Sequence, residues 1–203
     1  MATSAPEAHP RPMKPARSPA TYDDVLAAPK SVNAELLDGE LFLHPRPAKP
    51  HTLTSSALQA QLHTAFQLGR HGPGGWWILH EPEIHLGPHV VVPDIAGWRR
   101  ADLPELDLSL AYFAEVPAWV CEVLSPGSES YDRVKKLRTY GQAGVHWAWL
   151  VHPEQRTLEA FERRADVWTL VDAHEDDAVV RVPPFDAVAL ELDTLWARPR
   201  GEG

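Results

Sequence analysis

The chain has 203 residues, of which 44% are hydrophobic and 23% are charged, and its formal net charge is -9. A chain of this length normally forms one domain with a sizeable core. The acidic balance argues against a protein that coats nucleic acid by bulk charge, because such binding depends on neutralising phosphates with Lys and Arg. It leaves open an acidic site set inside a locally basic groove.

The only cysteine, Cys121, excludes an intramolecular disulfide framework and a Cys-rich zinc module. A single thiol fits a reducing compartment, and we expect a cytoplasmic protein. No window approaches the roughly 18 apolar residues of a membrane span. We therefore expect no membrane partner.

The two ends of the chain differ in composition from the middle. Residues 1–20 are rich in proline and hold almost no large apolar side chain, so burial cannot offset the entropy of ordering them. The sequence predicts a disordered Pro-rich arm over residues 1–20, a single domain over residues 21–196 and a C-terminal tail over residues 197–203. The arm also lacks the apolar segment of a secretory signal.

The first predicted elements are a short helix and a hairpin. Thr21 is a typical N-cap residue and is followed by acidic side chains, which predicts a short helix that ends near Pro29. The Asp38-Gly39 pair has the usual chemistry of a two-residue turn. It predicts a hairpin with strands at Ala34–Leu37 and Glu40–Leu43.

The rest of the chain alternates between helical and strand patterns. Apolar residues at three-and-four spacing predict a helix from Leu53 to Leu68, and a second helix is predicted from Tyr131 to Ala143, ended by Gly144. Strands are predicted at Trp76–Leu86, His89–Trp98, Ala118–Leu124, Trp147–Val151, Thr157–Glu162, Val167–Asp172 and Ala178–Val182. This order predicts an α+β (mixed α/β) fold around one central sheet.

Two acidic residues lie inside apolar stretches. Asp94 follows three valines and Pro93, and Glu122 lies in the middle of a predicted buried strand. A buried carboxylate without a partner costs several kcal/mol, so each needs a cation or an ion pair. Together they suit a hard divalent ion such as Mg²⁺, which takes oxygen ligands. The structural alternatives are an Asp that caps a turn and a Glu paired with an Arg on the same face.

Lys136 lies in the helix predicted after Glu122, four residues from both Asp132 and Tyr140. This spacing places Lys136 on the flank of the buried face of the helix. From there its ammonium would reach the carboxylates and stabilise charge that develops at phosphorus. The alternative is an ordinary helix pair with Asp132, worth about 0.2–0.5 kcal/mol.

Two segments carry a family resemblance: VVPDIAGWRR, and WVCEVLSPGSESYDRVKKLRTYGQAGVHWAWLVHPEQ. They resemble the Uma-two family of endonucleases in the PD-(D/E)XK nuclease superfamily. The resemblance runs from Tyr22 to Leu195 and includes the hairpin ELLDGEL and the stretch from Pro45 to His51. It implies a restriction-endonuclease-like central mixed sheet flanked by helices.

The resemblance also implies metal ligands. Asp94 matches the metal-binding Asp of the superfamily, and Glu122 matches its second metal carboxylate. The backbone carbonyl of Val123 would be a further ligand. Acidic positions that match the family and would complete the site are Glu40 and Glu81.

One position departs from the superfamily pattern. Its Lys normally stands two residues after the second carboxylate, where this chain has Leu124. In the family pattern the next helix supplies the Lys. Lys136 matches that position, with Lys135 as the fallback.

Other reactive residue types favour structural roles. His80, His85 and His89 offer no clean pair on one face, which disfavours a zinc site. The tryptophans of the predicted strands alternate as core residues do. Ser125 lacks the flanking glycines of a nucleophile elbow, and Cys121 points to the side of its strand opposite Glu122, as a buried thiol would.

Two functions from different classes follow. The first is a metal-dependent phosphodiesterase acting on DNA, in which Mg²⁺ or Mn²⁺ held by Asp94 and Glu122 activates water for in-line attack at phosphorus. Basic residues would then contact phosphates, namely Arg99, Arg100, Lys135 and Arg138. The second is a non-catalytic interaction module with the nuclease fold, which would form a homodimer through edge strands or the Trp-rich sheet. A metal-independent glycoside hydrolase with two carboxylates is a third interpretation.

The nuclease hypothesis makes a geometric prediction. Asp94, Glu122 and Lys136 should converge in one pocket bordered by the Leu53–Leu68 helix. Carboxylates on opposite faces of the sheet would rule the hypothesis out. Without a metal, the two carboxylates are expected to repel each other and to raise each other's pKa.

Overall fold

The computed structural model describes residues 19–197. The predicted arm and tail therefore lie almost entirely outside the described residues. The helical elements are α1 (Tyr22–Leu26), α2 (Lys49–Leu62), η1 (His63–Gln67), η2 (Tyr131–Lys136), α3 (Leu137–Ala143) and η3 (Leu192–Leu195). The strands are β1 (Val32–Leu37), β2 (Glu40–Pro45), β3 (Trp76–His80), β4 (Ile84–Leu86), β5 (His89–Val91), β6 (Ile95–Arg99), β7 (Trp119–Val123), β8 (Trp147–His152), β9 (Thr157–Arg164), β10 (Val167–Glu175), β11 (Val179–Val180) and β12 (Leu190–Glu191).

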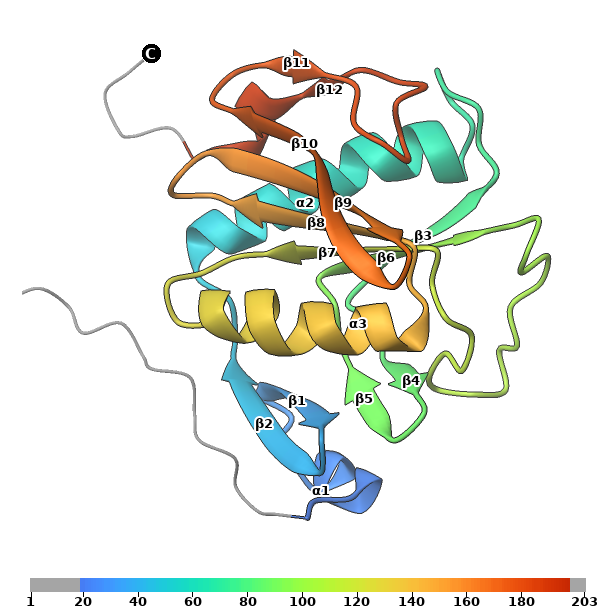
Figure 1. Ribbon diagram of the computed structural model, residues 1–203, viewed down its shortest axis with the longest axis vertical. Helices are drawn as coiled ribbons and strands as arrows, with labels where there is room; N and C mark the ends of the chain where they lie inside the picture. Colours follow the sequence, from blue (N-terminus) through green and yellow to red (C-terminus); the bar gives the residue numbers. More distant parts are fainter. Residues whose placement is uncertain (1–18, 198–203) are drawn as a thin grey trace, which may run out of the picture.

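A six-stranded sheet with the order β10-β9-β8-β7-β6-β3 forms the centre of the molecule. The pair β7 and β8 is parallel and the other pairs are antiparallel, so the sheet is mixed. The segment η2–α3 connects the parallel pair, as a crossover between parallel strands requires. Helices α2 and α3 lie on opposite faces of this sheet (Figure 1). The predicted α+β class is confirmed.

A smaller sheet with the order β2-β1-β5-β4 lies beside the large one (Figure 1). Its β1–β2 hairpin turns at Asp38 and Gly39, which both have positive φ, at 51° and 73°. This is the conformation that a two-residue type I′ turn demands, and the predicted hairpin is confirmed. Strands β11 and β12 form a separate ribbon.

Two predicted long strands are each broken in the structure. The stretch 76–86 divides into β3 and β4, and the stretch 89–98 divides into β5 and β6. In each case one part belongs to the large sheet and the other to the small sheet. Pro93 stands at the second break and has no N–H to donate to a ladder. The prediction that Asp94 lies within a strand is therefore wrong, because Asp94 lies where the chain crosses between sheets.

The two predicted long helices differ from the structure in their ends and their winding. Helix α2 begins at Lys49, before the predicted Leu53, because Pro50 fits the first turn of a helix. It continues as the π-helix η1. The helix after β7 begins with the π-helical segment η2, which includes Lys136. Wide turns of this kind are frequent at functional sites.

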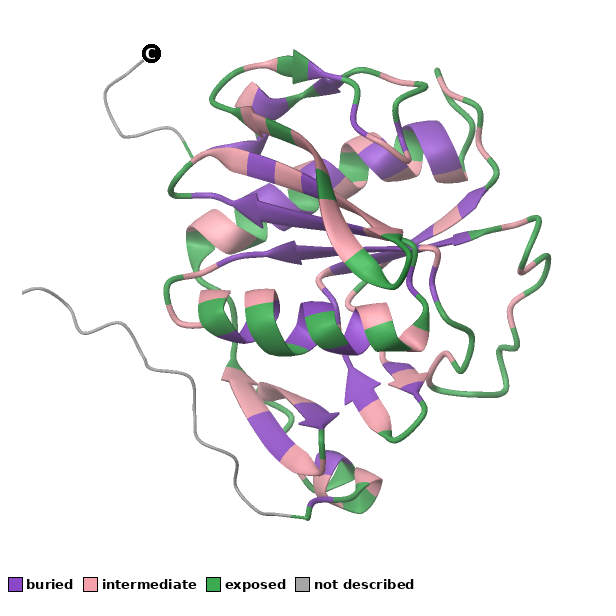
Figure 2. Ribbon diagram, viewed as in Figure 1, coloured by how far each residue is buried: buried purple, intermediate pink, exposed green. Residues whose placement is uncertain are grey.

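The central sheet buries one apolar cluster on each face (Figure 2). On the α2 face, Trp119, Trp149 and Phe185 pack edge to face. On the α3 face, Leu137 and Tyr140 pack against the sheet. Cys121 is fully buried on the α2 face, and burial raises the pKa of its thiol. Among residues 19–197, no helix is both long and apolar enough to cross a bilayer.

Candidate active site at the junction of the two sheets

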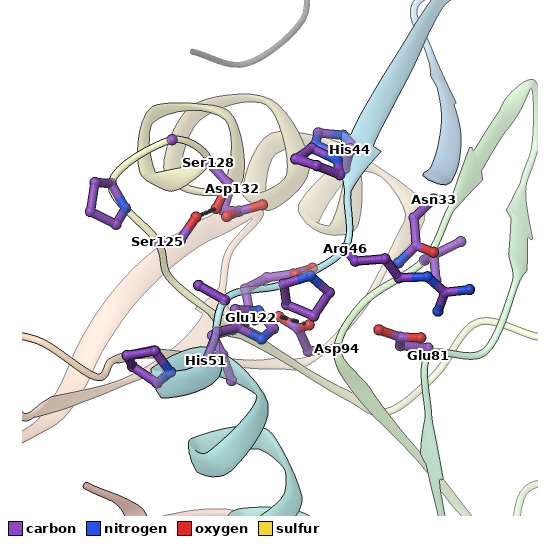
Figure 3. A pocket seen from close by; sticks show the side chains of 18 of the residues that line it. Asn33, His44, Arg46, His51, Glu81, Asp94, Glu122, Ser125, Ser128 and Asp132 are labelled. Atoms are coloured by element: carbon purple, nitrogen blue, oxygen red, sulfur yellow. Dashed lines mark hydrogen bonds and ion pairs between the residues drawn. The ribbon is translucent and has the colours of Figure 1, made fainter. Parts of the chain in front are cut away.

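A pocket of about 280 Å³ opens where the two sheets meet (Figure 3). Its walls come from the small sheet, the crossing segments, the end of β7, the start of α2 and the loop before η2. The titratable residues that line it are Glu35, His44, Arg46, His51, Glu81, Asp94, Glu122, Asp132, Lys136 and Glu154. Carboxylates outnumber cationic groups in this set, so the pocket favours a positively charged occupant.

Asp94 extends the sheet with its side chain. The β6–β7 ladder ends at the pair Ile95 and Cys121, and beyond it Asp94 Oδ2 accepts the backbone N–H of Val123 at 2.7 Å. The N–H and C=O of one residue in a strand point to the same edge, so the Val123 carbonyl also points toward Asp94. The other oxygen, Oδ1, lies 3.1 Å from His51 Nε2.

Glu122 is only 2% exposed and faces the α3 side of the sheet. Its carboxylate lies 2.9 Å from Lys136 Nζ and accepts the hydroxyl of Tyr140. Burial raises the pKa of Glu122, and the Lys136 ammonium opposes this effect. The charge of Asp94 adds to the rise, as expected for two neighbouring carboxylates, although it is a smaller cause than burial. The predicted structural alternative, a buried ion pair, is present with Lys in place of Arg.

Lys136 is more deeply buried than its expected place on the helix flank. It is 3% exposed, and its ammonium lies 3.1 Å from Glu35 Oε1, 2.9 Å from Glu122 and 3.2 Å from the Val92 carbonyl. Burial disfavours the charged amine, but Glu122 and Glu35 outweigh it and raise the pKa of Lys136 above its ordinary value. Lys136 therefore stays charged, with an acceptor for each of its three protons.

Glu35, on β1, was not among the predicted site residues. Burial alone would raise the pKa of this carboxyl, but the Lys136 charge, the contact with His44 and the Val92 N–H lower it to about 2. The signal was present in the sequence, because Glu35 opens the ELLDGEL hairpin of the family resemblance. The family resemblance implies instead Glu40, five residues later in the same hairpin, which pairs with Lys135 outside the pocket lining.

Asp132 and His51 complete the walls. Burial raises the pKa of Asp132 to about 6, although Lys136 and Ser128 favour its ionised form. Burial disfavours the charged imidazole of His51, but the contact with Asp94 outweighs it and raises the pKa of His51. His51 stands in the first turn of α2, so this helix borders the pocket through its start.

The structure separates the predicted residues into two groups. Asp94, Glu122, Lys136 and two further predicted residues, Val123 and Glu81, line the pocket. Glu40 and Lys135 do not line it and instead pair with each other at 3.0 Å.

The basic residues expected to contact phosphates also lie outside the pocket lining. Arg100 stacks on Trp77, with its guanidinium carbon 3.9 Å from the ring centroid, and donates to the carbonyl of Trp76. Arg46, which was not predicted, lines the pocket from the segment after β2 (Figure 3) and donates to the Lys30 carbonyl at 3.4 Å.

The side chains present suit a hard divalent ion. Asp94 and Glu122 offer carboxylate oxygens and Val123 offers a backbone carbonyl, and all three line one pocket. Within residues 19–197, no three His, Cys, Asp or Glu side chains form a ready metal cage. Mg²⁺ commonly uses only one or two carboxylates and keeps several waters, so the smaller donor set fits this ion.

Comparison with known proteins shows that the architecture is that of a nuclease-like fold. The chain is similar to a solved protein described as "a putative nuclease belonging to DUF820 from Anabaena variabilis ATCC 29413", with a TM-score of 0.71 and 22% identity. The similarity covers 87% of this chain and 97% of that chain. The model of the Uma2 family, "Putative restriction endonuclease", matches residues 19–194, and the chain belongs to this family. No curated protein matches the chain.

Proposed function

We propose that this protein is a metal-dependent endodeoxyribonuclease that hydrolyses phosphodiester bonds of DNA. The observation that carries the proposal is the convergence of Asp94, Glu122 and Lys136 in one pocket, in a chain of a nuclease-like family. Asp94 comes from the segment between the two sheets, Glu122 from strand β7 and Lys136 from the π-helical segment η2. A purely structural ion pair between Glu122 and Lys136 would not need Asp94 beside it.

Each residue has a role in this proposal. Asp94, Glu122 and the Val123 carbonyl hold Mg²⁺ or Mn²⁺, which when bound supplies Lewis-acid stabilisation and an activated water. Lys136 fixes the orientation of Glu122 and places a positive charge beside the reacting phosphate. Arg46, exposed at the pocket wall, contacts a substrate phosphate.

Nicking of supercoiled plasmid DNA in the presence of Mn²⁺ tests the function. We expect nicking by the wild type, and a loss on the order of 100-fold or more in Asp94→Asn, which keeps the size of the side chain but removes its charge. Glu162→Gln is a matched control, because Glu162 lies outside the pocket lining and pairs with Arg164. Nicking that survives both EDTA and Asp94→Asn would refute the proposal.

A second candidate function is a non-catalytic interaction module. The observation that favours it is that the carboxylates of Asp94 and Glu122 and the ammonium of Lys136 already have protein partners. Calorimetric titration with Mn²⁺ separates the candidates: binding that is lost in Asp94→Ala supports the enzyme, and no binding by the wild type supports the module. Light scattering tests the homodimer that the module would form.

A further inference from the structure

Glu35 is buried, and both oxygens of its carboxylate contact polar groups. It is 2% exposed, and its Oε1 accepts the Val92 N–H at 2.7 Å and lies 3.1 Å from Lys136 Nζ. Its Oε2 accepts the Tyr131 hydroxyl at 3.0 Å and lies 3.2 Å from His44 Nε2. A carboxylate with this many partners fixes the groups around it, because breaking any of the contacts leaves a buried polar group unpaired.

These contacts tie together the segments that carry the metal carboxylates and the lysine. Val92 stands two residues before Asp94, at the crossing between the sheets. Tyr131 and Lys136 are the first and last residues of η2. Glu35 therefore sets the position of η2 relative to the Asp94 segment, from a strand of the small sheet.

The second consequence concerns the charge of Lys136. One ammonium is shared between two carboxylates, at 3.1 Å from Glu35 and 2.9 Å from Glu122. If Glu35 were neutral, Lys136 would pair with Glu122 alone. In a buried site the Coulomb attraction between the two charges is strong, so the ammonium would compete with a divalent ion for the Glu122 oxygens.

We propose that Glu35 is a positioning residue, which keeps Glu122 available to a divalent cation by drawing the Lys136 ammonium toward itself. The inference rests on the proposed function, because it needs the cation to bind at Asp94 and Glu122. It assigns to the small sheet a part in the active site, in addition to its part in the fold.

Calorimetric titration with Mn²⁺ alone, without DNA, tests the role. We expect Glu35→Gln to weaken Mn²⁺ binding tenfold or more, and Glu162→Gln, which removes the same charge outside the pocket lining, to stay within twofold of wild type. Circular dichroism establishes that each variant is folded at the temperature of the titration. A folded Glu35→Gln that binds Mn²⁺ as tightly as wild type would overturn the inference.

A double-mutant cycle separates the action through Lys136 from a general loss of negative charge. We expect Glu35→Gln to weaken Mn²⁺ binding by at most threefold when it is introduced into Lys136→Met, against tenfold or more in the wild-type background. An equal factor in both backgrounds means that Glu35 acts only as a nearby charge or as a structural support, and overturns the inference.

A gentler variant keeps the test decisive if Glu35→Gln does not fold. Tyr131→Phe removes only the hydroxyl that holds Glu35 Oε2, and we expect it to weaken Mn²⁺ binding two- to fivefold. No change in that variant counts against the inference. Failure of the proposed function looks different: a wild type that binds no Mn²⁺ overturns both, whereas tight wild-type binding with an indifferent Glu35 overturns only the inference.

Discussion

The two faces of strand β7 are buried to the same degree, but one is entirely apolar and the other carries a charged residue beside the apolar Val120. All of its residues are at most 2% exposed. Trp119, Cys121 and Val123 pack into the apolar cluster under α2, whereas Glu122 faces Lys136 and Tyr140 on the α3 side. Burial of the apolar side chains on the α2 side favours the folded state directly. On the α3 side, burial of a charged group costs free energy unless that charge has a partner.

Under the proposed function, this difference separates the residues that stabilise the fold from the residues that carry the chemistry. The ring centroid of Trp119 lies 5.2 Å from that of Trp149 and 4.9 Å from that of Phe185, in edge-to-face contacts that add to the gain from apolar burial. The pair Glu122 and Lys136 gains Coulomb energy but loses hydration, and the two nearly cancel. Under the proposed function, this pair serves the chemistry of the site more than the stability of the fold.

The largest expected change in the free energy of unfolding comes from a substitution on the apolar face of β7. Trp119→Ala should destabilise the fold by about 3–5 kcal/mol, because the indole is fully buried among aromatic rings and the cavity cannot collapse easily. Urea denaturation monitored by circular dichroism measures this loss. A cost below about 1 kcal/mol would mean that this cluster is not the main source of stability.

The second largest loss of stability is expected on the charged face of β7. Lys136→Met should cost about 3 kcal/mol at pH 7, because Glu35 and Glu122 then share a buried site without their cation. Burial alone would raise the pKa of Glu35, but Lys136, His44 and the Val92 N–H together lower it from 4.5 to about 2. The stabilisation from this carboxylate is therefore present above pH 4.5 and is lost as the pH falls toward 2.

The difference between wild type and Lys136→Met should therefore be largest at neutral pH and should shrink below pH 4.5. Urea denaturation at pH 7 and pH 4 measures both values. A difference that does not change with pH would show that the methionine costs stability through packing and not through the lost charge.

The sequence was sufficient for features that depend on local pattern. The apolar neighbours of Glu122 predicted its buried strand, and Asp38-Gly39 predicted the hairpin turn. The hairpin motif of the sequence contains Glu35 but does not predict its contact with Lys136, because the two residues are about a hundred positions apart and no local periodicity relates them. The break at Pro93 was also missed, since an apolar run looks the same whether it stays in one sheet or crosses to another.

A smaller loss of stability is expected when the hydroxyl of Tyr140, which donates to Glu122, is removed. Tyr140→Phe removes the hydroxyl that donates to Glu122 and leaves the ring in place, so it should cost about 1–2 kcal/mol. Differential scanning calorimetry measures the change. If this variant were as stable as wild type, Lys136 alone would satisfy the buried carboxylate, and the hydroxyl would be dispensable for the fold.

The smallest effect is expected one residue away from one of the largest. Lys135 is 44% exposed, pairs with the 35% exposed Glu40, and has its ammonium 4.3 Å from the centroid of the Phe42 ring. Exposed pairs of this kind contribute about 0–1 kcal/mol, so Lys135→Ala should change stability by less than about 1 kcal/mol and leave Mn²⁺ binding within twofold. Urea denaturation and calorimetric titration of Lys135→Ala beside Lys136→Met measure both quantities. Two lysines with the same intrinsic chemistry then differ only in the side of the helix from which they project. Should Lys135→Ala instead lower Mn²⁺-dependent nicking of plasmid DNA by on the order of 100-fold, the lysine of the site would be the exposed one, and the buried Lys136 would belong to the stability of the fold.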